Sequence, residues 1–378
     1  MIYFDNASTT KIKSEVIEVM TKSMTEIYGN PSSTHSLGRK AKVAIETARN
    51  SIAKLMGCKP KEIIFTSGGT EADNAIIFNA VNNLNVERII SSPIEHHAVL
   101  ETISKIEQDK IVEVVWLKVD SYGSINFDEL EELLKENKQT LVSLMHVNNE
   151  IGNILNLKKA GNICKQYNAI FHSDTVQGIS HLSYNLADTP VDFICASAHK
   201  FGGPKGVGFI YKREGVSFAK QILGGEQERD FRAGTENIHG IIGMQKALEI
   251  SFSEHEETEK HILKLKSHLI SLLRREIKGL VFNGLSDDLE KSISTIVNIK
   301  LPLKKANKML VFQFDLKGIA ISEGSACSAG NNLGSHVLKA LNPNSDLGSN
   351  IRISFSKENT IEEVDVFVKV LKDFINKN

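Results

Sequence analysis

Short apolar runs alternate with amphipathic segments along the first part of the chain. The runs are rich in β-branched and aromatic residues and are too short for ordinary helices, while the segments between them repeat their apolar residues at helical spacing. This alternation is typical of βαβ units around a mostly parallel sheet. Seven strands are predicted, at 62–66, 87–91, 112–118, 140–146, 169–173, 191–196 and 207–211. The helices between them are expected near 70–83, 96–107, 127–136 and 157–167.

Helical periodicity also flanks this region on both sides. Two helices, near 14–28 and 36–56, precede the first strand, and one long helical stretch from Thr235 to Ile277 follows the last. Beyond that stretch the elements become shorter, which predicts a second, smaller α+β domain. Its strands are predicted at 293–299, 319–322 and 351–355, and its helices near 304–315, 335–341 and 361–376.

The composition does not change the predicted architecture, but it argues against nucleic acid and anionic membranes as partners. Lys and Arg number 45 against 46 Asp and Glu, without a long run of one sign, so neither nucleic acid nor an anionic membrane is expected as a partner. The N-terminus has no secretion signal, and no apolar run is long enough to span a membrane. The cysteines lie far apart without a C-x-x-C pair, which argues against a zinc site and for a reducing compartment. We expect a soluble, cytoplasmic protein.

A lysine at the end of a buried strand is the first candidate for chemistry. Lys200 follows the apolar run 191–196 and precedes the turn Gly202-Gly203-Pro204. Open α/β sheets bind their ligands at the carboxyl ends of the strands, so a primary amine there is well placed. For an isolated lysine, a surface position beside a turn is the more common alternative.

Two other strand ends carry residues that fit a phosphorylated ligand. Ser67-Gly68-Gly69-Thr70 joins a strand to a helix, where backbone N–H groups can bind a single phosphate, although an ordinary tight turn is equally consistent with it. Asp174, with Gln177 three residues later, is suited to a cationic nitrogen or, alternatively, to a helix cap. Asn148 and Asn149 are turn formers or ligands for a carboxylate.

Further candidates are two histidines, two arginines and a cysteine. His96 and its neighbour at a helix start could stack on a ring or transfer protons, and adjacent helical histidines are poorly placed for a shared metal. Cys327 lies among small residues, which predicts a reactive thiol on a mobile loop. Arg232 and Arg352 could each pair with a substrate carboxylate. Together with Lys200 and the strand-end residues, these are the parts of a pyridoxal phosphate site.

On these residues the sequence resembles the cysteine desulfurases of the NifS/IscS type, which are class V aminotransferases of pyridoxal phosphate fold type I. The resemblance runs from Tyr3 to Phe355, and its most specific pieces are Ser197-Ala198-His199-Lys200 and Gly324-Ser325-Ala326-Cys327. It implies an α/β fold with a seven-stranded sheet. We place the large cofactor-binding domain at 14–255 and the small domain, which carries the cysteine loop, at 1–13 and 256–378.

The resemblance also implies a role for each matching residue. Lys200 would bond covalently to the cofactor, Asp174 would pair with the ring nitrogen, Gln177 would bind the ring hydroxyl, and His96 would stack on the ring and assist proton transfer. The implied phosphate ligands are Gly69, Thr70, Ser197 and His199, with Thr235 contributed by the second subunit of a homodimer. The implied substrate ligands are Asn149 and Arg352.

The implied activity is removal of sulfur from L-cysteine, leaving L-alanine and a persulfide on Cys327. The expected acceptor is an iron–sulfur scaffold or a tRNA-thiolation protein. Because the chain ends at Asn378, soon after the last predicted helix, we expect it to lack the C-terminal extension that scaffold-delivering members use, so the acceptor stays open. The spacing between Cys327 and Ser335 predicts a cysteine loop of the long, protein-delivering type. A selenocysteine lyase, another class V aminotransferase and a non-catalytic scaffold are the alternatives.

Overall fold

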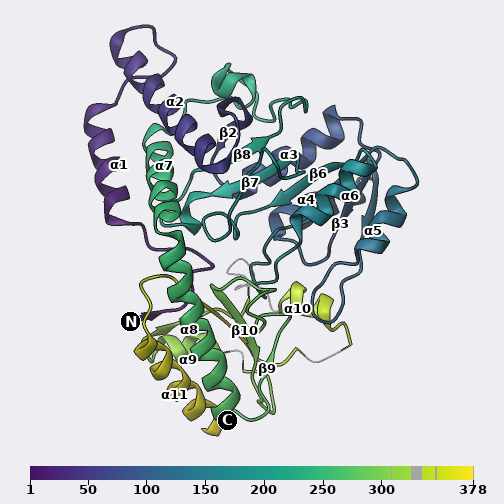
Figure 1. Ribbon diagram of the computed structural model, residues 1–378, viewed down its shortest axis with the longest axis vertical. Coiled ribbons are helices and arrows are strands. Elements are labelled where there is room, and N and C mark those ends of the chain that lie inside the picture. The colour runs from purple at the N-terminus through teal and green to yellow at the C-terminus, as the bar shows by residue number, and fades with distance from the viewer. Residues whose placement is uncertain (308, 325–333, 345–346, 378) are drawn as a thin grey trace.

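The computed structural model describes residues 1–307, 309–324, 334–344 and 347–377. Its central sheet has the strand order β2-β8-β7-β6-β5-β3-β4 (Figure 1). Only β8 runs against its neighbours, β2 and β7, and the other adjacent strands are parallel, which confirms the predicted mostly parallel sheet. The strands are β2 Ile63–Thr66, β3 Arg88–Ser91, β4 Glu113–Trp116, β5 Thr140–Ser143, β6 Ile170–Asp174, β7 Phe193–Ser197 and β8 Gly208–Lys212.

Helices pack on both sides of this sheet and enclose the larger hydrophobic core. α1 and α2 both pack against α7 at one side of the molecule (Figure 1). The apolar strand residues are buried partly in this core, as Phe65 and Ile194 are, and partly in smaller clusters, as Ile64 and Phe193 are. The helices of this region are α1 Ser14–Glu26, α2 Ser36–Met56, α3 Gly69–Asn83, α4 His97–Gln108, α5 Phe127–Leu134, α6 Leu157–Gln166 and α7 Ile238–Ser253.

A second hydrophobic core joins the C-terminal elements to the first residues of the chain. Phe4 packs edge-on against Phe355 and Phe367 within this core. β1 Ile2–Tyr3 pairs in parallel with β11 Ile319–Ala320. The remaining elements here are α8 His255–Glu276, β9 Val281–Phe282, β10 Ile296–Lys300, α9 Leu310–Asp315, α10 His336–Leu341, β12 Asn350–Ser354 and α11 Ile361–Lys377. The domain boundaries drawn from the sequence stay a prediction.

Two helix predictions are wrong in their extent. The stretch from Thr235 to Ile277 is two helices, because the Asn237 side chain accepts a hydrogen bond from Gly240 N and starts α7 late, while Glu254 leaves the helical conformation between α7 and α8. The helix expected at 304–315 begins only at Leu310, and ahead of it Asn307 Oδ1 accepts a hydrogen bond from Met309 N. None of the helices described here is long and apolar enough to cross a membrane.

A buried ion pair fixes the strand that leads into α3. Arg49 on α2 donates from Nη1 and Nη2 to the two carboxylate oxygens of Glu228, at 2.7 and 2.8 Å, and both side chains are 2% exposed. Glu228 also accepts a hydrogen bond from Phe65 N on β2, at 2.8 Å. The pair therefore connects α2, β2 and the segment after β8.

Replacing Glu228 with alanine is expected to lower the free energy of unfolding by about 3–5 kcal/mol, because the buried Arg49 charge would lose its bidentate partner and keep only the partly exposed Glu46. Urea denaturation measures the change. The matched control is Asp109→Ala, which removes an exposed i,i+4 partner of Lys105 and should cost far less. Equal losses in the two variants would contradict the structural role of the buried pair.

Candidate active site

The carboxyl ends of β6 and β7 and the amino end of α3 meet in one cavity of about 510 Å³. All but two of the residues to which the resemblance assigns a role line it, although they come from distant parts of the chain. These lining residues are Gly69, Thr70, His96, Asn149, Asp174, Gln177, Ser197, His199, Lys200 and Arg352.

The two exceptions are Thr235 and Cys327. Thr235 lies in a smaller neighbouring pocket, beside Gly206 and Arg232, and does not line the Lys200 cavity of its own chain. Cys327 lies outside the residues that the structure describes. Arg232, a further arginine candidate, binds Glu71 at 2.9 Å and also does not line this cavity.

The turn between β2 and α3 presents backbone N–H groups to the cavity. Gly68 is the N-cap residue of α3 and provides no side-chain cap, so the first N–H groups of the helix stay available to a ligand. Its φ of 150° suits glycine. Gly69 is needed for close packing, since a Cβ there would lie 2.8 Å from Cγ2 of Val176. This part of the cavity can bind a phosphate.

The opposite part of the cavity carries the lysine and the acid. Lys200 ends the short 3₁₀ turn Ala198–Lys200 after β7, and its Nζ donates to the backbone oxygens of Ala7 and Ser8 at 2.6 and 3.0 Å. Asp174 is the last residue of β6, and its Oδ1 accepts a hydrogen bond from Val176 N at 2.9 Å. Gln177 Nε2 donates to Ala7 O at 2.7 Å.

Two histidines in the cavity wall are neutral at neutral pH. His96 is the N-cap residue of α4, and its Nδ1 accepts a hydrogen bond from Ala98 N at 3.1 Å. Burial lowers the pKa of His96, and burial also lowers the pKa of His199 to about 4. Both can therefore exchange protons or form hydrogen bonds without adding positive charge.

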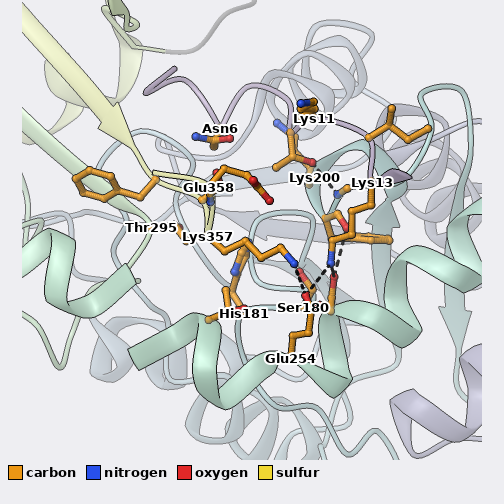
Figure 2. Close-up of a pocket in the computed structure, with 18 of the residues that line it drawn as sticks. Asn6, Lys11, Lys13, Ser180, His181, Lys200, Glu254, Thr295, Lys357 and Glu358 are labelled. Atoms are coloured by element: carbon orange, nitrogen blue, oxygen red, sulfur yellow. Dashed lines mark hydrogen bonds and ion pairs between the residues drawn. The ribbon is translucent and has the colours of Figure 1, made fainter. Parts of the chain in front are cut away.

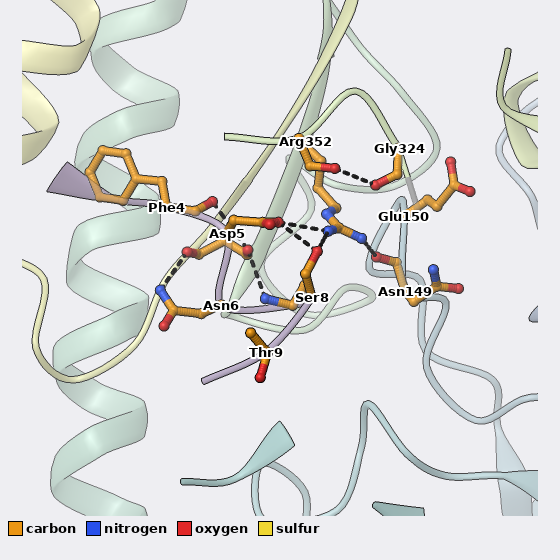
Figure 3. A network of polar contacts seen from close by, with 12 residues as sticks. Phe4, Asp5, Asn6, Ser8, Thr9, Asn149, Glu150, Gly324 and Arg352 are labelled. Carbon is orange, nitrogen blue, oxygen red and sulfur yellow. Dashed lines mark hydrogen bonds and ion pairs between the residues drawn. The ribbon is translucent and has the colours of Figure 1, made fainter. Parts of the chain in front are cut away.

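Arg352 on β12 reaches the cavity through a network of buried polar contacts (Figure 3). Its Nη2 donates to Asp5 Oδ1 at 2.9 Å and Ser8 Oγ at 2.6 Å, and its Nη1 donates to Asn149 O at 2.8 Å. The Nε atom is buried and has no hydrogen-bond partner among the described residues. A buried donor in this position suits an anionic ligand such as a carboxylate.

The sequence did not reveal the part that residues 5–10 play in this site. These side chains are small and polar, yet Thr10 Oγ1 also donates to His199 O at 2.9 Å, and Thr9 Oγ1 lies 3.2 Å from His199 Nδ1. The segment thus contacts residues on both sides of the cavity. A run of small residues carries no signal for its partners, so only the fold could show this role.

A second cavity, of about 360 Å³, is also lined by residues of this segment, among them Asn6 (Figure 2). Ala7, Gln177 and Lys200 line both cavities. At its far end Glu254 binds Lys357 at 2.7 Å and Lys13 at 3.6 Å. These contacts join the break between α7 and α8 to the chain before α1 and after β12.

Comparison with known proteins agrees with this geometry. The model of the family described as aminotransferase class V matches residues 2–367. Cysteine desulfurase IscS of Dictyoglomus turgidum is 39% identical over 379 residues, covering 100% of this chain and 95% of that protein. A solved NifS-like protein has a TM-score of 0.91 and 37% identity, with 100% of each chain covered. The structure of SspA in complex with cysteine has a TM-score of 0.80 and 30% identity, covering 94% of this chain and 99% of that one.

The chain belongs to the class V aminotransferase family. Enzymes of this family depend on pyridoxal phosphate, and the cavity fits that cofactor. The uncapped start of α3 suits its phosphate, the Asp174 carboxylate suits its ring nitrogen, and the Lys200 amine can bond to its aldehyde.

The contact at Gly69 allows a direct test of cofactor binding. Gly69→Ala is expected to weaken pyridoxal phosphate binding roughly tenfold, because the new methyl group would push Val176 toward the ring site at a cost of ~1–3 kcal/mol. Titration of the visible absorbance of the bound cofactor measures the affinity. The double variant Gly69→Ala/Val176→Ala should regain most of it, and a failure of this rescue would contradict the contact.

Proposed function

We propose that the protein is a cysteine desulfurase that removes sulfur from L-cysteine and carries it on Cys327. The observation that supports this most strongly is the convergence of Lys200, Asp174 and Arg352 on one cavity. Arg352 and Asn149 would hold the carboxylate of the amino acid, and Lys200 and Asp174 would hold the cofactor. The match over the full chain to a cysteine desulfurase, and the likeness to a protein solved with cysteine, support the choice of substrate.

The residues of the chain divide the work of the proposed reaction. When bound, the cofactor draws electrons from the α-carbon of the amino acid. Asp174 keeps its ring nitrogen protonated, which makes the withdrawal effective. The Lys200 amine, once released by the incoming amino acid, moves the proton at the α-carbon. The neutral His96 imidazole can take a proton from the substrate.

Sulfur transfer needs a nucleophile from the chain itself. The Cys327 thiolate would attack the sulfur of L-cysteine, forming a sulfur–sulfur bond as the carbon–sulfur bond breaks. The electron pair of the broken bond stays with carbon and is protonated, which gives L-alanine. The products are alanine and a Cys327 persulfide, and no external oxidant or reductant is consumed.

Cys327→Ser is expected to abolish two products, the alanine formed from L-cysteine and the persulfide on the protein. The reason is that the serine hydroxyl cannot accept the sulfur. Alanine is quantified without any added keto acid, which also distinguishes desulfuration from transamination. The matched control is Cys58→Ser, since burial raises the pKa of the Cys58 thiol to about 12 and leaves it protonated. Normal turnover by the Cys327 variant would overturn the assignment of the nucleophile.

We also propose that two copies of the chain form a homodimer in which Thr235 completes the phosphate site of the partner subunit. The position of Thr235 outside its own Lys200 cavity supports this arrangement. So do three large apolar side chains on α1 and α2, Ile17, Met24 and Val43, which are 49%, 54% and 65% exposed.

The sulfur acceptor would be an iron–sulfur scaffold or a tRNA-thiolation protein.

A further inference from the structure

A group of buried titratable side chains beside the cavity has no part in the mechanism above. Asp73 on α3, His172 on β6 and Cys195 on β7 are at most 1% exposed. The Cys195 Sγ atom lies 2.9 Å from Oδ1 of Asp73 and 3.5 Å from Oδ1 of Asp174. This buried group therefore touches the carboxylate that faces the ring nitrogen of the cofactor.

The distances in the group describe hydrogen bonds and not a metal site. A thiolate and a carboxylate oxygen that bind one tetrahedral zinc ion lie about 3.5 Å apart, given the usual metal–ligand bond lengths. The 2.9 Å between Cys195 and Asp73 is shorter and fits a thiol that donates to a carboxyl oxygen. Burial raises the pKa of Cys195, which keeps this thiol protonated.

Asp73 and Asp174 cannot both be charged at low cost. Burial raises the pKa of Asp73 well above its usual range, and the neighbouring Asp174 raises it further. The titratable groups that face Asp73 are His172 and Asp174 on β6, Cys195 on β7 and, ahead of α4, Glu95. His172 brings no compensating charge, because burial lowers its pKa to about 4.

The hydrogen bonds of His172 indicate where a proton on Asp73 would go. Its Nδ1 lies 2.9 Å from Ser143 Oγ, and its Nε2, buried without a hydrogen-bond partner among the described residues, lies 3.4 Å from Oδ1 of Asp73. If Asp73 carries a proton on Oδ1, it can donate to Nε2 and still accept from the Cys195 thiol. Each polar atom of the group then has a partner.

We propose that Asp73 is a positioning residue that stays protonated and donates to His172, so that the single negative charge under the cofactor ring resides on Asp174. The part of this inference that concerns the ring rests on the proposed function. One carboxylate and one protonated ring nitrogen form a neutral pair, whereas a second buried carboxylate would leave a charge without a partner. Asp73 would thus hold the Cys195 sulfur in contact with the Asp174 side chain without competing for the ring nitrogen.

The test compares the wild type with Asp73→Asn in the full-length chain, with and without cofactor. The amide has the shape of a protonated carboxyl and keeps an N–H for His172. In the unfolded chain Asp73 ionises above pH ~4, whereas in the folded protein it would keep its proton. The folding equilibrium of the wild type should therefore fall about tenfold per pH unit relative to the variant as the pH rises.

For a chain of 378 residues, a tenfold fall of the folding equilibrium constant per pH unit corresponds to a shift in melting temperature. The melting temperature of the wild type should fall relative to that of the variant by ~2 °C per pH unit between pH 5 and 8. The exposed variant Asp109→Asn should show no such slope against the wild type. A difference between the wild type and Asp73→Asn that does not change with pH would mean that folded Asp73 is ionised, and would overturn the proposal.

An infrared measurement covers the case in which Asp73→Asn does not fold. Glu95→Gln serves as the background, because burial raises the pKa of Glu95 to about 8 and its carboxyl would contribute a similar band. In that background a carbonyl band of a protonated carboxyl is expected at pH 7, and its absence would overturn the assignment of Asp73. Neither readout needs turnover, so a parent enzyme without desulfurase activity would refute the proposed function and leave this test intact.

Discussion

The site depends on the packing of residues 5–10 against it, seen here in the hydrogen bonds from Lys200 Nζ to the backbone oxygens of Ala7 and Ser8. They join the end of β7 to a segment that lies 193 and 192 positions earlier in the chain. The same segment binds Arg352 through Asp5 and Ser8 (Figure 3). Because the segment touches Lys200 and Arg352 together, it links the two residues across the cavity.

The order and direction of the strands in the sheet position the other groups of the cavity. Parallel strands end at the same edge, so Asp174 and Lys200 come together although 26 positions separate them in the sequence. The antiparallel strand β8 lies between β2 and β7 and pairs with both. This arrangement brings the glycine turn before α3 beside Ser197. A phosphate site, an acid and an amine therefore face one cavity without any long loop to position them.

Much of this arrangement was predictable from local patterns. Unbroken apolar runs identified the strands, and the chemistry-bearing residues follow them directly, as Lys200 follows β7. The pattern failed at some helix ends, as at α9, which begins only at Leu310. It also failed for the segment with Ala7 and Ser8, because backbone carbonyls that accept from a distant lysine leave no trace in residue type. The Asp73–Cys195 contact was equally invisible, since it requires the register between α3 and β7.

We expect Lys200 to bond covalently to pyridoxal phosphate in this cavity. Borohydride reduction of the cofactor-loaded protein, followed by peptide mass mapping, tests for this bond. We expect the pyridoxyl phosphate group on the peptide that contains Lys200, and no labelled peptide after Lys200→Ala. A label on a different lysine, or none in the wild-type protein, would contradict the account.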